Sequence, residues 1–210
     1  MQILKEISDA LQDGSLKDVT ELVQKALEQG INGKDILEKG LLEGMGVVGE
    51  KFKNNEVYVP EVLIAARAMN AGTEVLKPAL VDEGVQTKGT IVLGTVKGDL
   101  HDIGKNLVRM MMEGKGLKVI DLGVDVSVEK FIKSAKLEKA QVIACSALLT
   151  TTMNEMKRVV EAVKEADGCH NVKIMVGGAP LTDQFRESIG ADIYAPDAAS
   201  AADEALLICK

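Results

Sequence analysis

A single histidine stands between two carboxylates in the glycine-flanked segment Lys97-Gly98-Asp99-Leu100-His101-Asp102-Ile103-Gly104-Lys105. A carboxylate at Asp99 can accept a hydrogen bond from one ring nitrogen of His101. The other nitrogen is then free to act as a base or as a metal ligand. The glycines at 98 and 104 allow a bulky ligand to approach the backbone closely. The alternative interpretation is a surface histidine in a polar loop that caps a helix.

A metal cage built by the protein alone is not indicated. The second histidine, His170, and the three cysteines, Cys145, Cys169 and Cys209, do not stand at the spacing of metal ligands. A lone imidazole suits a metal whose other ligands come from a macrocycle. The cysteines also lack the number and spacing of a disulfide framework, so we expect buried or incidental thiols.

The His101 segment follows the first of several short apolar runs in the second half of the chain. These runs, at 90–96, 118–122, 141–145, 172–176 and 193–194, alternate with helical patterns at 103–115, 127–138, 150–166 and 181–189, and a C-terminal helix follows. The alternation predicts a five-stranded, parallel, doubly wound sheet of the Rossmann or flavodoxin-like class. Ligands of such sheets bind beyond the carboxyl ends of the strands, so we expect the site in the loops that follow them.

The first 80 residues have a different periodicity. Apolar residues such as Ile3, Ile7 and Leu11 recur at intervals of three and four, which is helical spacing. Breaks at 13–15, 30–33 and 54–55 predict four helices of one to four turns, the last with Pro60 at its start. We therefore expect an α + α/β protein. A four-helix bundle and its linker (81–88) would occupy residues 1–88, and an α/β domain residues 89–210.

The composition argues against several other classes of protein. The chain has 210 residues, of which 46% are apolar and 27% charged, and it contains no apolar stretch long enough to cross a bilayer. The N-terminus has neither the basic flank nor the long apolar stretch of an export signal, so a cytoplasmic protein with no membrane partner is expected. A net charge of -7, two tyrosines, three phenylalanines and no tryptophan argue against nucleic acid as a partner.

Three motifs resemble the cobalamin-binding signature of corrinoid proteins and of methionine synthase. They are Asp99-x-His101-x-x-Gly104, Ser146-x-Leu148 and Gly177-Gly178, each at the end of an expected strand. The helical half is similar to the cap module that precedes the corrinoid domain in methyl-transfer proteins. The resemblance therefore covers nearly the whole chain and implies a cobalamin-binding domain preceded by a helical bundle cap.

The resemblance implies a role for each matching residue. His101 would be the lower axial ligand to cobalt in place of the nucleotide base of the cofactor, the base-off/His-on arrangement. Asp99 and Thr152 would form a hydrogen-bonded relay with it, although methionine synthases carry a serine at the position of Thr152. The other implied cofactor-binding residues are Gly98, Asp102, Ile103, Gly104, Ser146, Leu148, Thr150, Gly177 and Gly178, together with Phe52, Val59 and Val62 over the upper face of the corrin.

The resemblance also implies the function of a methyl carrier. A substrate-specific methyltransferase would deliver a methyl group to Co(I), and a second methyltransferase that uses tetrahydrofolate or a thiol would take it from methyl-Co(III). A reductive activator of cobalt is a further implied partner. The cap would have to move on a flexible linker before these partners reach the cobalt. The methyl donor can be methanol, a methylamine, a betaine or a methoxylated aromatic.

Other interpretations stay open. A cobalamin-dependent sensor can use the same two modules, although this acidic chain has no basic recognition helix. A stand-alone mutase subunit would not account for the helical half, and a flavodoxin-like nucleotide-binding domain would take up no cobalamin. For Phe52, Val59 and Val62 the alternative is the plain core of the bundle.

Overall fold

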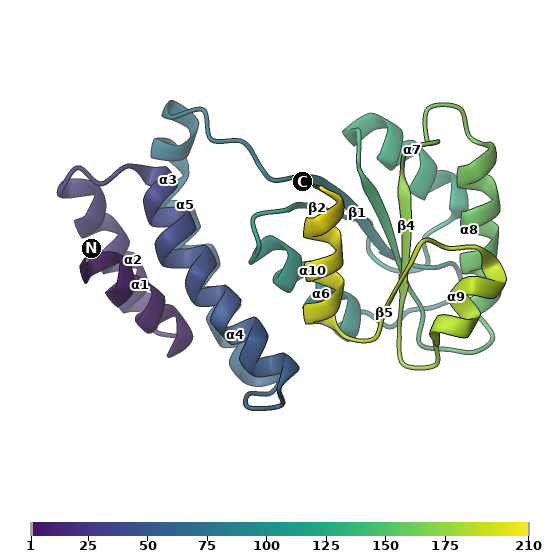
Figure 1. The fold of residues 1–210 in the computed structure, drawn as a ribbon, viewed down its shortest axis with the longest axis horizontal. Coiled ribbons are helices and arrows are strands. Elements are labelled where there is room, and N and C mark those ends of the chain that lie inside the picture. The colour runs from purple at the N-terminus through teal and green to yellow at the C-terminus, as the bar shows by residue number, and fades with distance from the viewer. Residues whose placement is uncertain (1, 210) are drawn as a thin grey trace. The chain divides into compact units, whose positions relative to one another are not determined.

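The structure is a computed structural model that describes residues 2–209 (Figure 1). The chain divides into two compact units, residues 1–86 and 87–210. The first unit is helical, and the second combines a parallel sheet with helices on both of its faces. The predicted α + α/β architecture is therefore confirmed.

The helical unit contains the four predicted helices, one of them in three sections. They are α1 (Gln2–Gln12), α2 (Leu16–Glu28), α3 (Gly33–Ile36) continued by the π-helical turn η1 (Leu37–Leu42) and by α4 (Glu43–Lys53), and α5 (Val59–Asp82). With 24 residues, α5 is longer than the predicted four turns and includes the first two residues of the expected linker.

A contact at the end of α5 explains this length. The carboxylate of Glu83, the residue after the helix, accepts the backbone N–H groups of Gly33 at 2.6 Å and Lys34 at 3.0 Å. It thereby caps the start of α3. The end of α5 is thus attached to its own unit by a contact between residues 50 positions apart, which local sequence signals do not reveal.

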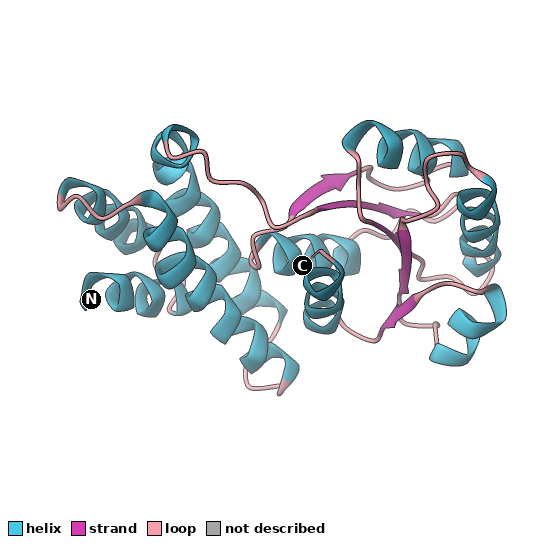
Figure 2. Ribbon diagram, turned by 45° about the horizontal axis from the view of Figure 1, so that its top comes forward, coloured by secondary structure: helices cyan, strands magenta, loops and turns pink. Residues whose placement is uncertain are grey.

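The second unit contains a parallel sheet with the strand order β2-β1-β3-β4-β5 (Figure 2). The strands are β1 (Thr90–Thr95), β2 (Lys118–Asp121), β3 (Val142–Ser146), β4 (Lys173–Gly177) and β5 (Ile193–Ala195). Each end lies within one residue of its predicted position. This is the flavodoxin-like order, in which the chain changes direction across the sheet between β1 and β3.

Helices cover both faces of this sheet. They are α6 (Ile103–Glu113), α7 (Val128–Glu138), α8 (Met153–Glu165), α9 (Asp183–Ile189) and α10 (Ala198–Ile208). Helices α6 and α10 pack against each other on one face, and α7, α8 and α9 lie on the other (Figure 2). Helix α8 begins three residues later than predicted because the backbone N–H of Thr152 bonds to the carbonyl of Leu149 in a turn.

The core of the α/β unit is tightly packed. The ring of Phe131 is fully buried, and a Cβ at Gly94 of β1 would lie 2.9 Å from it, so the glycine allows α7 to approach the sheet. The three cysteines are free, with Cys145 and Cys169 buried and Cys209 partly buried. None of the helices in the described range is long and apolar enough to cross a membrane.

Candidate functional site

The strand register brings the three sequence motifs to one edge of the sheet. Thr95 at the end of β1 pairs with Ser146 at the end of β3, and Ser146 pairs with Gly177 at the end of β4. The loops that follow these strands therefore begin side by side, at the point where ligands bind in this class of fold. The candidate site is formed by these loops.

Asp99 lies at the buried centre of the site. Its side chain is 0% exposed, and its Oδ1 lies 2.6 Å from Nδ1 of His101 and accepts the backbone N–H of the same residue at 3.1 Å. Its Oδ2 accepts the backbone N–H groups of Leu148 at 2.8 Å and Leu149 at 3.1 Å, and the hydroxyl of Thr152 at 2.9 Å. One carboxylate thus joins the loop after β1 to the loop after β3.

This environment keeps Asp99 ionised. Burial raises the pKa of the carboxyl group, but the hydrogen bonds from His101, Leu148 and Thr152 outweigh burial and hold the pKa of Asp99 well below its usual range. An ionised carboxylate can only accept hydrogen bonds, so Nδ1 of His101 carries the proton. The lone pair of a neutral ring is then on Nε2.

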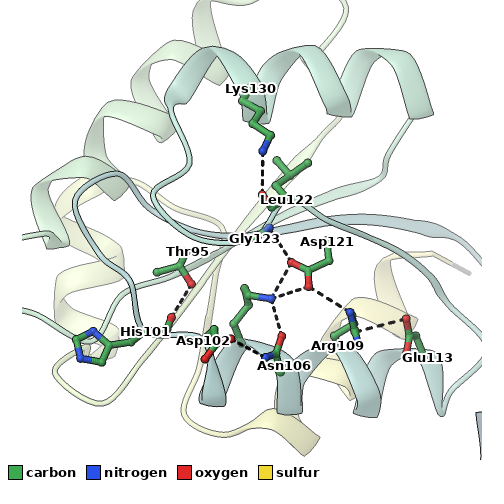
Figure 3. Close-up of polar contacts among 11 residues, drawn as sticks. Thr95, His101, Asp102, Asn106, Arg109, Glu113, Asp121, Leu122, Gly123 and Lys130 are labelled. Atoms are coloured by element: carbon green, nitrogen blue, oxygen red, sulfur yellow. Dashed lines mark hydrogen bonds and ion pairs between the residues drawn. The ribbon is translucent and has the colours of Figure 1, made fainter.

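The backbone of His101 is fixed as well as its ring. The hydroxyl of Thr95 donates to the carbonyl of His101 at 2.9 Å (Figure 3). The side chain of His101 is 50% exposed, so the ring is held from beneath and open to a ligand. The arrangement presents one directed imidazole nitrogen, which is suited to an axial metal ligand.

The two loops joined by Asp99 also carry exposed apolar side chains. Leu100 and Ile103 are 71% and 76% exposed, and Leu148 and Leu149 are 44% and 41% exposed. Single exposed apolar residues are common on proteins, but these four belong to two loops that meet at Asp99. They provide exposed apolar surface on the two loops that Asp99 joins, which fits a large, flat cofactor.

Two glycines allow the loop after β4 to approach its neighbours closely. Gly178 has a φ of +141°, and a Cβ there would overlap the carbonyl oxygen of Ala147. A Cβ at Gly177 would lie 3.2 Å from the carbonyl oxygen of Ala195. These two residues therefore shape the edge of the sheet next to the end of β3.

Gly104 differs from these glycines because packing within the chain does not require it. A Cβ at this position in the first turn of α6 would meet no atom within 4 Å. A glycine inside a helix costs about 1 kcal/mol relative to alanine. Its presence beside the exposed Ile103 keeps a space open next to the apolar surface, as a ligand-binding role requires.

The remaining predicted residues of the α/β unit lie around this centre. Asp102 immediately precedes α6, and its Oδ2 accepts a hydrogen bond from Nδ2 of Asn106 at 3.1 Å. Thr150 lies exposed in the turn before α8, and Ser146 ends β3 with its side chain partly buried. Gly98 has a φ of +81° and donates its backbone N–H to the carboxylate of an aspartate after β2.

The cap residues lie at the connection between α4 and α5. Phe52 is in the last turn of α4 and Val59 begins α5, and both side chains are partly exposed. Val62, one turn further along α5, is 0% exposed and belongs to the core of the helical unit. The side chains of Phe52 and Val59 thus have exposed surface that could contact a ligand. Val62 instead packs in the core of the helical bundle, which was the alternative interpretation of these three residues.

Several residues that were not predicted from the sequence also support the site. Asp125 accepts the N–H of Gly98 at 2.7 Å, and its own N–H donates to the carbonyl of Asp99 at 3.0 Å. The hydroxyl of Thr95 donates to the carbonyl of His101, and the side chain of Lys105, in the first turn of α6, is buried. The signal for Asp125 and Thr95 was their position at or just after the end of a predicted strand.

Comparison with known proteins identifies the family. Two family models, each described as a B12 binding domain, match residues 89–206 and residues 3–77. Trimethylamine corrinoid protein 1 of Methanosarcina mazei is 45% identical to the chain, over 98% of this chain and 98% of its own length. The chain belongs to the family of corrinoid proteins of methyltransferase systems. Dimethylamine corrinoid protein 2 of Methanosarcina acetivorans is 42% identical, over 97% of this corrinoid protein and 94% of its own length.

Solved structures agree with this assignment. A chain of the methanol:cobalamin methyltransferase complex MtaBC from Methanosarcina barkeri matches with a TM-score of 0.89 at 32% identity, over 99% of this corrinoid protein and 80% of that chain. A cobalamin-binding protein from Desulfitobacterium hafniense matches with a TM-score of 0.80 at 30% identity, over 96% of both chains. The single directed imidazole and the exposed apolar surface on the two loops fit the corrinoid that the family binds.

Proposed function

We propose that this corrinoid protein is a methyl carrier. It accepts a methyl group from a substrate-specific methyltransferase and passes it to a second methyltransferase that uses tetrahydrofolate or a thiol, and a reductive activator maintains the cobalt. The bound corrinoid supplies the cobalt centre that holds the methyl group. The observation that carries the proposal is the contact of 2.6 Å between His101 and the buried carboxylate of Asp99.

In this proposal His101 binds cobalt through Nε2 and replaces the nucleotide base of the cofactor. Asp99 keeps the proton on Nδ1 and so keeps the lone pair of Nε2 available. With a corrinoid bound, Nε2 would hold the metal, and the carboxylate of Asp99 would hold the ring in the orientation that this requires. The hydroxyl of Thr152 is 2.9 Å from both Asp99 Oδ2 and the carbonyl of Leu149, so its proton has two acceptors within hydrogen-bond distance.

Other residues of the chain exclude water and accommodate the rest of the cofactor. The displaced nucleotide tail would enter a slot beside the sheet, lined by Ser146, Leu148, Gly177 and Gly178. Phe52 and Val59 would shield the upper face. The segment 83–89, between α5 and β1, would allow the cap to move when a partner needs access.

We further propose a methylated amine as the donor used by the first partner. The support is the similarity to trimethylamine and dimethylamine corrinoid proteins at 39% to 45% identity, against 32% for the matched chain of the methanol complex. The test is a screen of methylamines and methanol with the cognate methyltransferase, measured as methylation of the reduced corrinoid. Methylation from methanol alone would contradict this part of the proposal.

The ligand role of His101 can be tested with the two histidines of the chain. The wild-type protein, H101A and the control H170A are labelled with ¹⁵N-histidine and loaded with cobalamin, and the Co(II) forms are compared by electron paramagnetic resonance. His170 is exposed on the loop before β4. We expect coupling from a protein nitrogen in the wild type and in H170A, and its loss in H101A. An unchanged spectrum of H101A, or a wild-type spectrum with the cofactor's own base bound, would overturn the proposal.

A further inference from the structure

A second charged cluster lies between α6 and the end of β2, around Asp121 (Figure 3). The side chain of Lys105 is 2% exposed. Its Nζ lies 2.7 and 2.6 Å from the two carboxylate oxygens of Asp121 and 2.7 Å from Oδ1 of Asn106. Arg109 also contacts Asp121, at 3.3 Å. The buried ammonium group is thus fully surrounded by acceptors.

Such a pair is a poor way to gain stability alone. Lys105 is buried and Asp121 is 19% exposed, so the pair loses most of its contact with water, and such an ion pair is often no more stabilising than apolar side chains of the same volume. Apolar side chains cannot, however, make directed hydrogen bonds that fix one segment relative to another. An amine with three fixed acceptors holds the first turn of α6 at one position relative to Asp121, at the end of β2.

One arm of the cluster reaches the residue that follows His101. Asn106, which accepts a hydrogen bond from Lys105, donates from Nδ2 to the carboxylate of Asp102 at 3.1 Å. The backbone N–H of Asn106 also donates to the carbonyl of Asp102 at 2.7 Å. The position of Asp102 is therefore tied to the buried amine through a single residue.

The other arm reaches His101 itself. Oδ1 of Asp121 accepts the N–H of Gly123 at 2.9 Å, and the carbonyl of Gly123 accepts the N–H of Thr95 at 3.0 Å. The hydroxyl of Thr95 in turn donates to the carbonyl of His101 at 2.9 Å. The two arms form a continuous set of contacts from the ion pair to both ends of the 101–102 segment.

We infer that Lys105 and Asp121 are positioning residues for His101: their ion pair fixes the backbone of residues 101 and 102, while Asp99 directs the ring. The inference rests on the proposed role of His101 as the cobalt ligand. The pair acts on His101 through Asn106, Gly123 and Thr95. A side chain that is to hold a metal would do so best when its backbone is already fixed in the binding position.

The chain offers a matched control on the same strand. Lys118, at the start of β2, pairs with Glu138 at 2.8 Å, whereas Asp121 ends the strand. The variants K105M and K118M therefore each remove a lysine–carboxylate pair from one end of β2. With methylcobalamin bound at a fixed neutral pH, we expect the equilibrium constant for the His-on form to fall about tenfold in K105M and to stay unchanged in K118M, measured by absorption spectra.

A measurement without cofactor provides an independent readout. In the apoprotein, amide hydrogen exchange of residues 101–106 should become at least about tenfold faster in K105M and should keep the wild-type rate in K118M. The double variant K105M/D121L replaces the ion pair by apolar side chains. We expect it to regain the thermal stability lost in K105M without regaining the His-on fraction. The apolar side chains fill the same volume, but they make no hydrogen bonds that fix the position of residues 101 and 102.

The outcomes separate this inference from the proposed function. Wild-type His-on equilibria in K105M or in K105M/D121L would overturn the positioning role. If K105M does not fold, the double variant decides the question. If H101A itself keeps the wild-type spectrum, the proposed function fails. If H101A loses the spectrum while K105M keeps it, only the role of Lys105 and Asp121 fails.

Discussion

The D99N variant changes one carboxylate oxygen at the centre of the site into an amide nitrogen and leaves the volume of the side chain nearly unchanged. The two oxygens of Asp99 accept hydrogen bonds from three backbone N–H groups, from the imidazole and from a hydroxyl. An amide has one oxygen that accepts and one nitrogen that only donates. D99N therefore forces a choice between the two sides of the site.

The two orientations of the amide have different consequences. If its oxygen stays toward Leu148 and Leu149, its nitrogen faces both Nδ1 and the backbone N–H of His101, and that N–H loses its acceptor. The ring must then accept at Nδ1 and carry its proton on Nε2, which removes the lone pair that binds a metal. If the oxygen faces His101, the two leucine N–H groups lose their acceptor inside the protein.

The number of hydrogen bonds lost in each orientation gives the expected change in the free energy of unfolding. A buried donor left unpaired costs about 1–3 kcal/mol, so the second orientation costs about 2–6 kcal/mol for its two N–H groups. The first orientation costs less in folding and is therefore favoured. We expect D99N to unfold with a free energy about 1–3 kcal/mol below that of the wild type. We also expect it to lose the His-on form of bound cobalamin.

Urea unfolding of the apoprotein and absorption spectra of the methylcobalamin-loaded protein measure these two effects. T152S is the matched control, because it changes a neighbour of Asp99 but keeps the hydroxyl that donates to Oδ2. It should retain the His-on spectrum. If D99N kept both the His-on spectrum and the wild-type unfolding free energy, the reasoning from the tautomer would be refuted.

Three further outcomes are expected. The pKa of Asp99 is lowered in the folded state, so the stability that this group contributes is complete above its unfolded pKa of about 4 and is lost as the pH falls below that value. In urea titrations between pH 2 and 6, the unfolding free energy should therefore fall more steeply with decreasing pH in the wild type than in D99N. Equal slopes in the two proteins would contradict this. G178A should lower the unfolding free energy by at least about 2 kcal/mol in urea titrations, because its φ is +141° and a Cβ would overlap Ala147; wild-type stability would be inconsistent with this geometry. G104A should be as stable as the wild type or up to about 1 kcal/mol more stable, yet bind cobalamin more weakly in equilibrium titrations; unchanged affinity would show that the space at Gly104 is not used.

The sheet was predictable because its signals are local. Five short apolar runs between amphipathic stretches determine where the strands lie, and every strand end was predicted to within one residue. The π-helical turn η1 was not predicted. A Cβ at Gly40 in this turn would lie 3.1 Å from the side chain of Ile7 in α1, so the turn packs closely against a segment far away in the sequence. Periodicity within one segment does not contain that information.

The same distinction applies to the candidate site. The loops that carry Asp99 and Thr152 were predicted from strand ends alone, because parallel strands bring their carboxyl ends to one edge. The burial of Lys105 could not be predicted in this way. A lysine in the first turn of an amphipathic helix is usually exposed. Only the position of Asp121 at the end of the neighbouring strand gives this buried lysine a carboxylate partner.

The two supports of His101 are suited to a side chain that holds a metal. Burial raises the pKa of Asp121, but its contacts with Lys105, Gly123 and Arg109 outweigh burial and lower it, and the pKa of Asp99 is lowered as well. Both carboxylates therefore keep their charge near neutral pH. Asp99 contacts the ring of His101 directly, whereas Asp121 reaches its backbone through Gly123 and Thr95. Direction of the ring and position of the backbone are thus set by separate carboxylates, so D99N should act on the tautomer and K105M on the geometry of the same bond.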